Sequence, residues 1–147
     1  MKRIMAAVDD AEQALHVARA AVDLAQGLHA GVVLVTVGDI IEGSQPDLER
    51  YRREEHVEDS LAVLTVDAAE RRLSSLRTQL GGRPDLDITC QVLVGNVAEQ
   101  IVSYARQQPI DVIAIGHRSR GRLAGLLAGS VAKQVIDTAP CPVLVVR

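Results

Sequence analysis

Aromatic residues are nearly absent from this chain of 147 residues, which contains two tyrosines, no tryptophan and no phenylalanine. Hydrophobic residues still make up 48% of the sequence, so the core must be built from Val, Leu, Ile and Ala. That share and the length favour one folded domain over a disordered chain. Modules that bind nucleic acid by stacking bases on aromatic rings are disfavoured, because the rings are missing.

An excess of positive charge is also absent. Sixteen Lys and Arg residues stand against nineteen Asp and Glu residues, for a net charge of -3. Without a long basic run, the chain has no electrostatic footprint for binding nucleic acid. All the basic residues except Lys2 and Lys133 are Arg, whose planar fork suits phosphate or carboxylate, so the places where Arg clusters are informative.

Long apolar runs and cysteines are scarce. No apolar run approaches the ~18 residues of a membrane helix. The stretch before Asp9 and Asp10 is too short for a signal peptide. Cys90 and Cys141 make no disulfide framework and no CxxC motif, and we interpret them as reduced thiols of the core. These observations predict a cytoplasmic protein without a membrane partner.

Short apolar segments alternate with segments of helical periodicity along the chain. The predicted strands are residues 2–8, 31–37, 88–94, 111–116 and 143–146. The predicted helices are residues 12–29, 57–80, one that opens after Asn96, and a short one from about 130 to 137. The strands lack polar alternation, as parallel strands covered on both faces do. This order predicts a Rossmann-like α/β fold, a doubly wound five-stranded parallel sheet in a single domain over residues 1–147.

Local signals delimit several of these elements. Gly81, Gly82 and Pro84 predict the end of the long helix. Asn96 with Glu99 predicts a capping box at the start of the next helix. Residues 38–53 are rich in Gly, Ser, Pro and charge, and we expect a mobile loop there.

Ligands of such sheets sit beyond the carboxyl ends of the strands, which directs attention to Asp9, Val37, Gly95 and residues 116–131. The last segment is rich in Gly, starts at a strand end and finishes at a helix N-terminus, where free N–H groups and the helix dipole favour an anion. Three arginines of this segment occupy alternate positions: Arg118, Arg120 and Arg122. The segment predicts a phosphate cradle, although the arginines are equally consistent with exposed loop charges.

Two familiar phosphate loops do not match. Gly116 and Gly121 have the glycine spacing of a P-loop, but Arg122 and Leu123 replace the required Lys and Ser/Thr. No GxGxxG follows the first strand, so the dinucleotide-binding fingerprint is absent.

Instead, the segment resembles the signature of the universal stress protein family, Gly-x2-Gly-x9-Gly-Ser/Thr. Gly116 fits the first glycine and Gly129 with Ser130 fits the last pair, whereas Ser119 replaces the second glycine. Three further segments resemble the family in the same order: residues 6–9, 94–101 and 139–146. The resemblance covers nearly the whole chain.

The resemblance implies a fold like that of the adenine nucleotide alpha hydrolases, a homodimer joined through the C-terminal strand, and, in one branch of the family, ATP binding. It places the adenine or ribose end of the nucleotide at Ala7, Val8 and Asp9, and the base between Val37 and Ile115. It places the ribose and phosphates at Gly116, Arg118, Ser119, Gly129, Ser130 and Val131. Ser119 is expected to weaken nucleotide binding rather than abolish it, because a serine at positive φ costs about 1–2 kcal/mol.

Three hypotheses follow. The first is a regulatory stress-response homodimer that binds an adenine nucleotide, ATP with or without Mg²⁺, and acts on an unidentified protein partner. The second is a dimeric scaffold of the same fold without nucleotide. The third is an enzyme, a slow ATPase or an adenylyl transferase, although no paired acid and base or arranged nucleophile is recognisable. His117 has no second His at ligand spacing, so no metal site is predicted, and Asp111 is expected to serve the structure.

Overall fold

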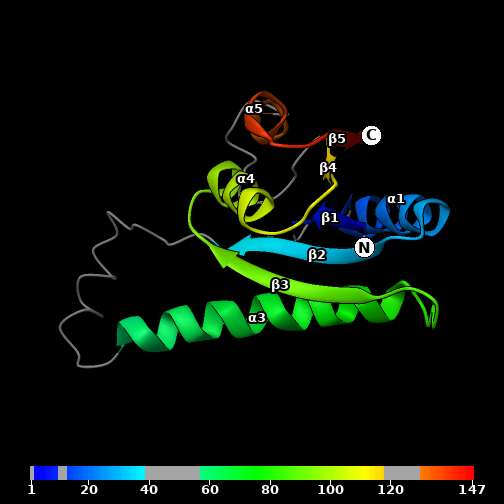
Figure 1. Cartoon of the computed structure of the whole chain (residues 1–147). Helices are drawn as coiled ribbons and strands as arrows, with labels where there is room; N and C mark the ends of the chain where they lie inside the picture. The colour runs from blue at the N-terminus through cyan, green and yellow to red at the C-terminus, as the bar shows by residue number, and fades with distance from the viewer. Residues whose placement is uncertain (1, 10–12, 39–56, 118–129) are drawn as a thin grey trace.

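The computed structural model describes residues 2–9, 13–38, 57–117 and 130–147, with the backbone alone for residues 57–65. Figure 1 shows its elements in chain order: β1 (Arg3–Ala7), α1 (Gln13–Leu28), β2 (Gly31–Gly38), α3 (Val57–Gln79), β3 (Ile88–Val94), α4 (Val97–Gln107), β4 (Val112–Gly116), α5 (Ser130–Thr138) and β5 (Val143–Val146). The predicted strands and helices are confirmed, and every bound that was predicted agrees to within one residue. The loop predicted over residues 38–53 lies almost wholly outside the described residues.

The five strands form one parallel sheet in the order β3-β2-β1-β4-β5. From β1 the chain adds strands in one direction as far as β3 and then returns to place β4 on the other side of β1. The order of strands therefore reverses between β1 and β4, where Ala7 lies in register with Ile115. In doubly wound sheets such a reversal marks the place where ligands bind.

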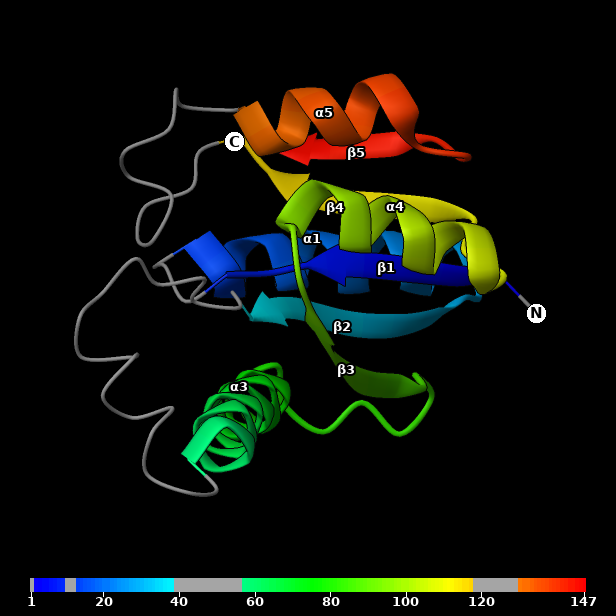
Figure 2. The same ribbon diagram turned by 90° about the vertical axis from the view of Figure 1, so that its left-hand side faces the viewer.

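Helices cover both faces of the sheet and divide the core in two. On one face, α1 and α3 pack on strand residues that include Ile4, Val32 and Ala114. On the other, α4 and α5 lie side by side and pack on residues that include Val33 and Ile113 (Figure 2). Both faces are covered, which explains why the strands are apolar without alternation.

Small and aliphatic side chains fill this core. The stripe of α1 that faces the sheet consists of Val17, Ala18, Ala21, Val22 and Ala25. Alanines at these positions let the helix lie close to the strands. Among the described residues, the buried side chains are aliphatic or that of Met5, as predicted, while the ring of Tyr104 packs, partly buried, against the core on the α4 and α5 face.

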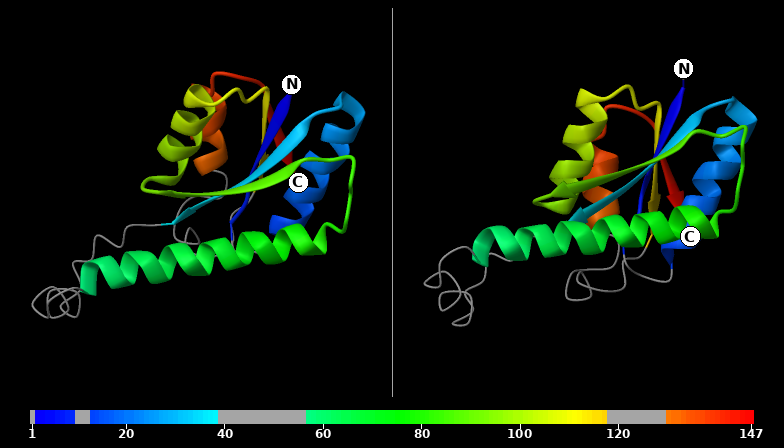
Figure 3. Two further views of the ribbon diagram at one scale, coloured as in Figure 1. Left: turned by 60° about the horizontal axis from the view of Figure 1, so that its bottom comes forward. Right: turned by 90° about the horizontal axis from the view of Figure 1, so that it is seen from below.

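Helix α3 is longer than the strands that it covers. Figure 3 shows its N-terminal end beyond the carboxyl ends of β2 and β3. Gly81 follows the helix with φ of 79°, a conformation that favours glycine, as predicted for the helix end.

The turn from β3 into α4 is fixed by Gly95 and Asn96. Gly95 has φ of 136°, and its N–H donates to the carbonyl of Gly38 at 3.1 Å. A Cβ on Gly95 would lie 3.0 Å from Nε2 of Gln100. A larger residue is therefore disfavoured both by this close approach and by the positive φ. Asn96 caps α4, since its Oδ1 accepts the N–H of Glu99 at 3.1 Å. The structure thus shows this bond of the predicted capping box.

The interpretation of the cysteines as reduced thiols of the core is wrong for Cys90 and holds in part for Cys141, which packs against the core on the α4 and α5 face. Both are free, but Cys90 is exposed and Cys141 is only partly buried. Cys90 lies on β3, a strand at the edge of the sheet, where neighbouring elements cover the side chains less completely. Partial burial raises the pKa of the Cys90 thiol, and the nearby charge of Arg77 opposes this effect. No helix within the described residues is both long enough and apolar enough to cross a membrane.

Candidate functional site

The carboxyl ends of β1 and β4 lie next to each other at the reversal of strand order. Backbone bonds continue the sheet one residue past both strands: the N–H of Val8 donates to the carbonyl of Val35 at 2.8 Å, and the N–H of His117 donates to that of Val146 at 2.8 Å. These amides are therefore already used within the sheet. A ligand at this edge would meet mainly side chains and the segments that leave the strands.

Four of the predicted site residues come together at this edge from four different elements. Ala7 ends β1, Val37 lies near the end of β2, Ile115 lies near the end of β4, and Val131 is the second residue of α5. All four belong to the core on the α4 and α5 face. Ile115 is buried and the other three are partly buried. We call this set, Ala7, Val37, Ile115 and Val131, the apolar rim.

Val8 and Asp9 follow the apolar rim residue of β1 but differ from it. The side chain of Val8 is only 6% exposed and packs in the other core, with α1 and α3. This orientation leaves the backbone of Val8, rather than its side chain, for any contact at the edge. Asp9 is partly buried, and it brings a carboxylate to the end of β1.

Polar groups at the start of α5 complete the edge. Gly116 ends β4 in register with Val146, and Ser130 is the first residue of the helix, partly buried. The first N–H groups of a helix have no partner within it and carry partial positive charge, which suits an anion. The edge therefore combines an aliphatic surface, a carboxylate and a helix start, the set of contacts that a base, a ribose and phosphates require.

The profile of the universal stress protein family matches residues 1–147. The chain belongs to the universal stress protein family. A universal stress protein of Thermus aquaticus, from the QAH/OAS sulfhydrylase 3′ region, is 32% identical over 146 residues, which are 99% of this chain and 98% of that protein. The structure of the universal stress protein UspA from Lactobacillus plantarum is 27% identical, with a TM-score of 0.73 over 99% of this chain and 97% of that one.

Two universal stress protein structures with the same fold contain adenine nucleotides. One, described as a complex with cAMP, has a TM-score of 0.67 at 18% identity and covers 99% of this chain and 97% of its own. The other, from Archaeoglobus fulgidus in complex with dAMP, has a TM-score of 0.59 at 23% identity and covers 100% of this chain and 98% of its own. Both comparisons support the fold.

The structure describes eight of the eleven site residues predicted for this universal stress protein. Arg118, Ser119 and Gly129 lie outside the described residues, so the predicted phosphate contacts of the loop and the effect of Ser119 stay predictions. Among the residues that the structure does describe, no group of three His, Cys, Asp or Glu side chains could hold a metal ion.

Sequence reasoning missed Gln13, the first residue of α1. Its side-chain oxygen is buried and has no hydrogen-bond partner among the described residues. The signal was available in the sequence, because Gln13 precedes the buried Val17 by one helical turn and so occupies the stripe where an apolar residue is expected.

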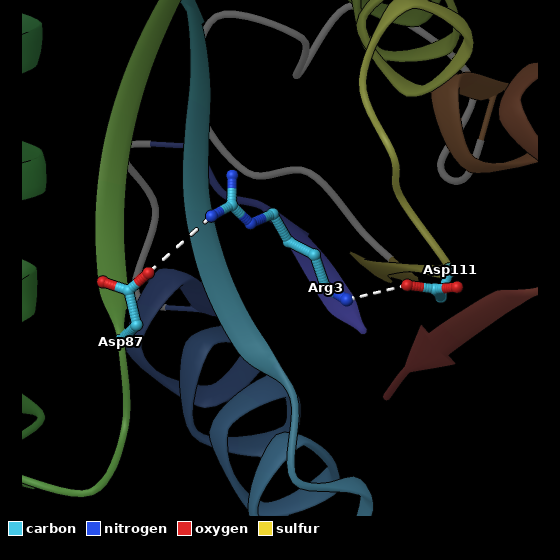
Figure 4. A network of polar contacts seen from close by, with 3 residues as sticks. All are labelled: Arg3, Asp87 and Asp111. Carbon is cyan, nitrogen blue, oxygen red and sulfur yellow. Dashed lines mark hydrogen bonds and ion pairs between the residues drawn. The ribbon is translucent and has the colours of Figure 1, made fainter. Parts of the chain in front are cut away.

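At the opposite edge of the sheet, Asp111 has the structural role predicted for it. Its carboxylate Oδ2 accepts the N–H of Arg3 at 2.7 Å, while its own N–H donates to the carbonyl of Arg3 at 2.9 Å. The guanidinium of Arg3 also lies 3.7 Å from the carboxylate of Asp87 (Figure 4). These contacts connect the starts of β1, β3 and β4.

Proposed function

We propose that this universal stress protein is a cytoplasmic, homodimeric regulator of the stress response that binds an adenine nucleotide, ATP in the first instance. The observation that supports this function best is the apolar rim, which stands beside Asp9 and the start of α5 at the reversal of strand order. The nucleotide state of the dimer would control its contact with a protein partner. The family relationship and the nucleotides named for two structures of the same fold support the proposal.

Each part of the nucleotide has a counterpart at this edge. The base would pack between Val37 and Ile115, since aliphatic side chains replace the missing aromatic rings. The ribose would lie near Asp9, and the phosphates would lie near Gly116, Ser130 and the loop predicted to carry Arg118, Ser119 and Gly129. Mg²⁺, where it accompanies the nucleotide, would be held chiefly by phosphate oxygens and water.

The decisive experiment identifies small molecules released from the purified, denatured protein by mass spectrometry, followed by calorimetric titration with ATP. We expect an adenine nucleotide, and binding of ATP in preference to GTP. At 100 times its dissociation constant, ATP should stabilise the folded protein by about 2.7 kcal/mol. A protein that is purified without nucleotide and is not stabilised by ATP would contradict the proposal and favour the nucleotide-free scaffold.

The homodimer would form through β5, which lies at an edge of the sheet. Its Leu144 is 36% exposed on the face of α1, and Ile136 of α5, on the opposite face, is 51% exposed. Two exposed aliphatic side chains beside an unpaired strand edge suit a second copy of the chain. Light scattering coupled to gel filtration should give a dimer for the wild type and a monomer for Leu144→Glu; a wild-type monomer at micromolar concentration would refute this part.

We do not propose an enzyme, although slow hydrolysis of ATP is compatible with the site. The carboxylate of Asp9 lies at the end of β1, and the sequence contains no recognisable motif of paired acid and base or of an arranged nucleophile. Phosphate release over many turnovers that is lost in Asp9→Ala would revive the enzymatic alternative.

A further inference from the structure

The side chain of Gln13 combines burial with an unmet need for a hydrogen bond. Gln13 lies one turn before Val17 and so begins the stripe of α1 that faces the sheet. Its Oε1 is buried, and no described residue donates to it. Buried amide oxygens are almost always hydrogen-bonded, so this oxygen is a candidate acceptor for a donor that a ligand brings.

The position of Gln13 and the chemistry of a nucleotide favour the ribose hydroxyls as the donor to Oε1. The apolar rim that would hold the base belongs to the α4 and α5 face, whereas the stripe of α1 belongs to the opposite face with Val8. A base held by the apolar rim would therefore lie on the face away from α1, and its amino group would not reach Oε1 of Gln13. Phosphate oxygens are acceptors at neutral pH and cannot donate to a carbonyl oxygen. The ribose hydroxyls remain, and they are good donors.

We propose that Oε1 of Gln13 accepts a hydrogen bond from a ribose hydroxyl of the bound nucleotide, and so selects ribonucleotides over deoxyribonucleotides. The proposal rests on the proposed function, because it needs a nucleotide at the carboxyl edge. The position of Gln13 supports it: Gln13 is the first residue of α1, the helix that follows β1, and Asp9, at which the ribose is expected, lies just past the end of β1. Within the described residues the oxygen has no donor, and the ligand supplies one.

The test removes the ribose hydroxyl from the ligand and Oε1 from Gln13, first separately and then together. Binding of ATP, 2′-deoxy-ATP and 3′-deoxy-ATP is measured by calorimetry for the wild type and for Gln13→Leu. We expect one deoxynucleotide to bind the wild type about three- to tenfold more weakly than ATP, and Gln13→Leu to lose a similar factor for ATP. Gln13→Leu should bind ATP and that deoxynucleotide equally, since the hydroxyl no longer has its acceptor.

A control variant and a measurement of stability distinguish a loss of the ribose contact from a general effect of the substitution. Gln26→Leu is the matched control, an exposed glutamine at the other end of α1, and it should bind like the wild type. The melting temperature of free Gln13→Leu should equal or exceed that of the wild type, because leucine removes a buried, unpaired oxygen. Gln13→Met serves as the second variant if leucine does not fold well.

Three results would overturn the inference. If Gln13→Leu discriminates between ATP and the deoxynucleotides as the wild type does, the oxygen does not contact the ribose, while nucleotide binding itself stands. If the free variant melts at a lower temperature, the protein itself supplies the donor. If the wild type binds none of the three nucleotides, the proposed function fails first and the inference fails with it.

Discussion

At the amino ends of the strands, polar groups of the protein bond one another, whereas at the carboxyl ends four aliphatic side chains form the apolar rim. At the amino edge, Asp111 exchanges two hydrogen bonds with Arg3, and the N–H of Val32 donates to the carbonyl of Asp87 at 2.8 Å. The carboxyl edge offers Asp9, Ser130 and the start of a helix beside the rim. Both edges belong to the same sheet, so the difference comes from the side chains that each edge carries and from the helices that start at the carboxyl edge.

The difference teaches how one sheet separates stability from binding. At the amino edge, polar groups form hydrogen bonds between strands that are far apart in the sequence, as the bond between Arg3 and Asp111 shows. Helices start at the carboxyl edge, and the first N–H groups of a helix have no partner within it, which suits a ligand. Substitutions at the amino edge should therefore change stability, and substitutions at the carboxyl edge should change binding.

The largest effect is expected at the apolar rim. Val37→Asp places a carboxylate where the base would pack, and ATP binding should fall about 100-fold or more, because the charge must lose water without a partner. Thr36→Asp is the matched control: it is also partly buried, lies next along β2 and faces the opposite side of the sheet. Calorimetry should show near-wild-type affinity for the control, and equal losses in the two variants would break the comparison.

Asp111→Ala should act on stability alone. The substitution removes a charged acceptor from the N–H of Arg3, and the free energy of unfolding should fall by about 1 kcal/mol, less than for a buried bond because Asp111 is exposed. Urea denaturation measures the change. ATP affinity should stay within about twofold of the wild type, and a larger loss of affinity would show that the two edges are coupled.

The same carboxylate should control the reactivity of Cys141. Partial burial raises the pKa of the Cys141 thiol, the negative charge of Asp111 raises it further, and a hydrogen bond with the backbone of Ile113 opposes both. Asp111→Asn removes the charge, so the pKa should fall and the thiolate fraction at pH 8 should rise. Alkylation of Cys141 should accelerate by less than about tenfold, as followed by mass spectrometry.

Cys90 in the same samples is the internal control for this prediction. Its pKa depends on its own burial and on Arg77, not on Asp111, so its rate of alkylation should not change. Unchanged rates at both cysteines would show that the charge of Asp111 does not reach the Cys141 thiol.

The smallest effect is expected for the ion pair between Arg3 and Asp87. Its atoms are 3.7 Å apart and the side chain of Asp87 is 55% exposed, so water screens the interaction. Asp87→Asn should lower the free energy of unfolding by no more than about 0.5 kcal/mol in urea denaturation. A loss as large as that of Asp111→Ala would mean that the network of Figure 4 acts as a unit.

Much of the candidate site was predictable from sequence because its parts lie at the ends of strands. Val37 and Ile115 close apolar segments, and the carboxyl ends of parallel strands meet at one edge. The face on which each side chain lies was not predicted. Val8 stands between Ala7 and Asp9 in the resemblance, yet it packs with α1 and α3, since neighbouring residues of a strand point to opposite faces. Cys90 was misjudged for a related reason, because sequence does not reveal which strand is at an edge.

The sequence by itself determined the elements and their alternation, because apolar periodicity, Gly81 and the Asn96 cap act within one helix or strand. It also determined the family, since the matching segments follow one another in order and spacing. Only the tertiary structure decided the strand order β3-β2-β1-β4-β5, the grouping of the apolar rim on one face and the burial of Oε1 of Gln13. These features depend on residues that are far apart in the sequence, as Arg3 and Asp111 are at a separation of 108 positions, and such contacts exist only once the helices have packed the sheet from both sides.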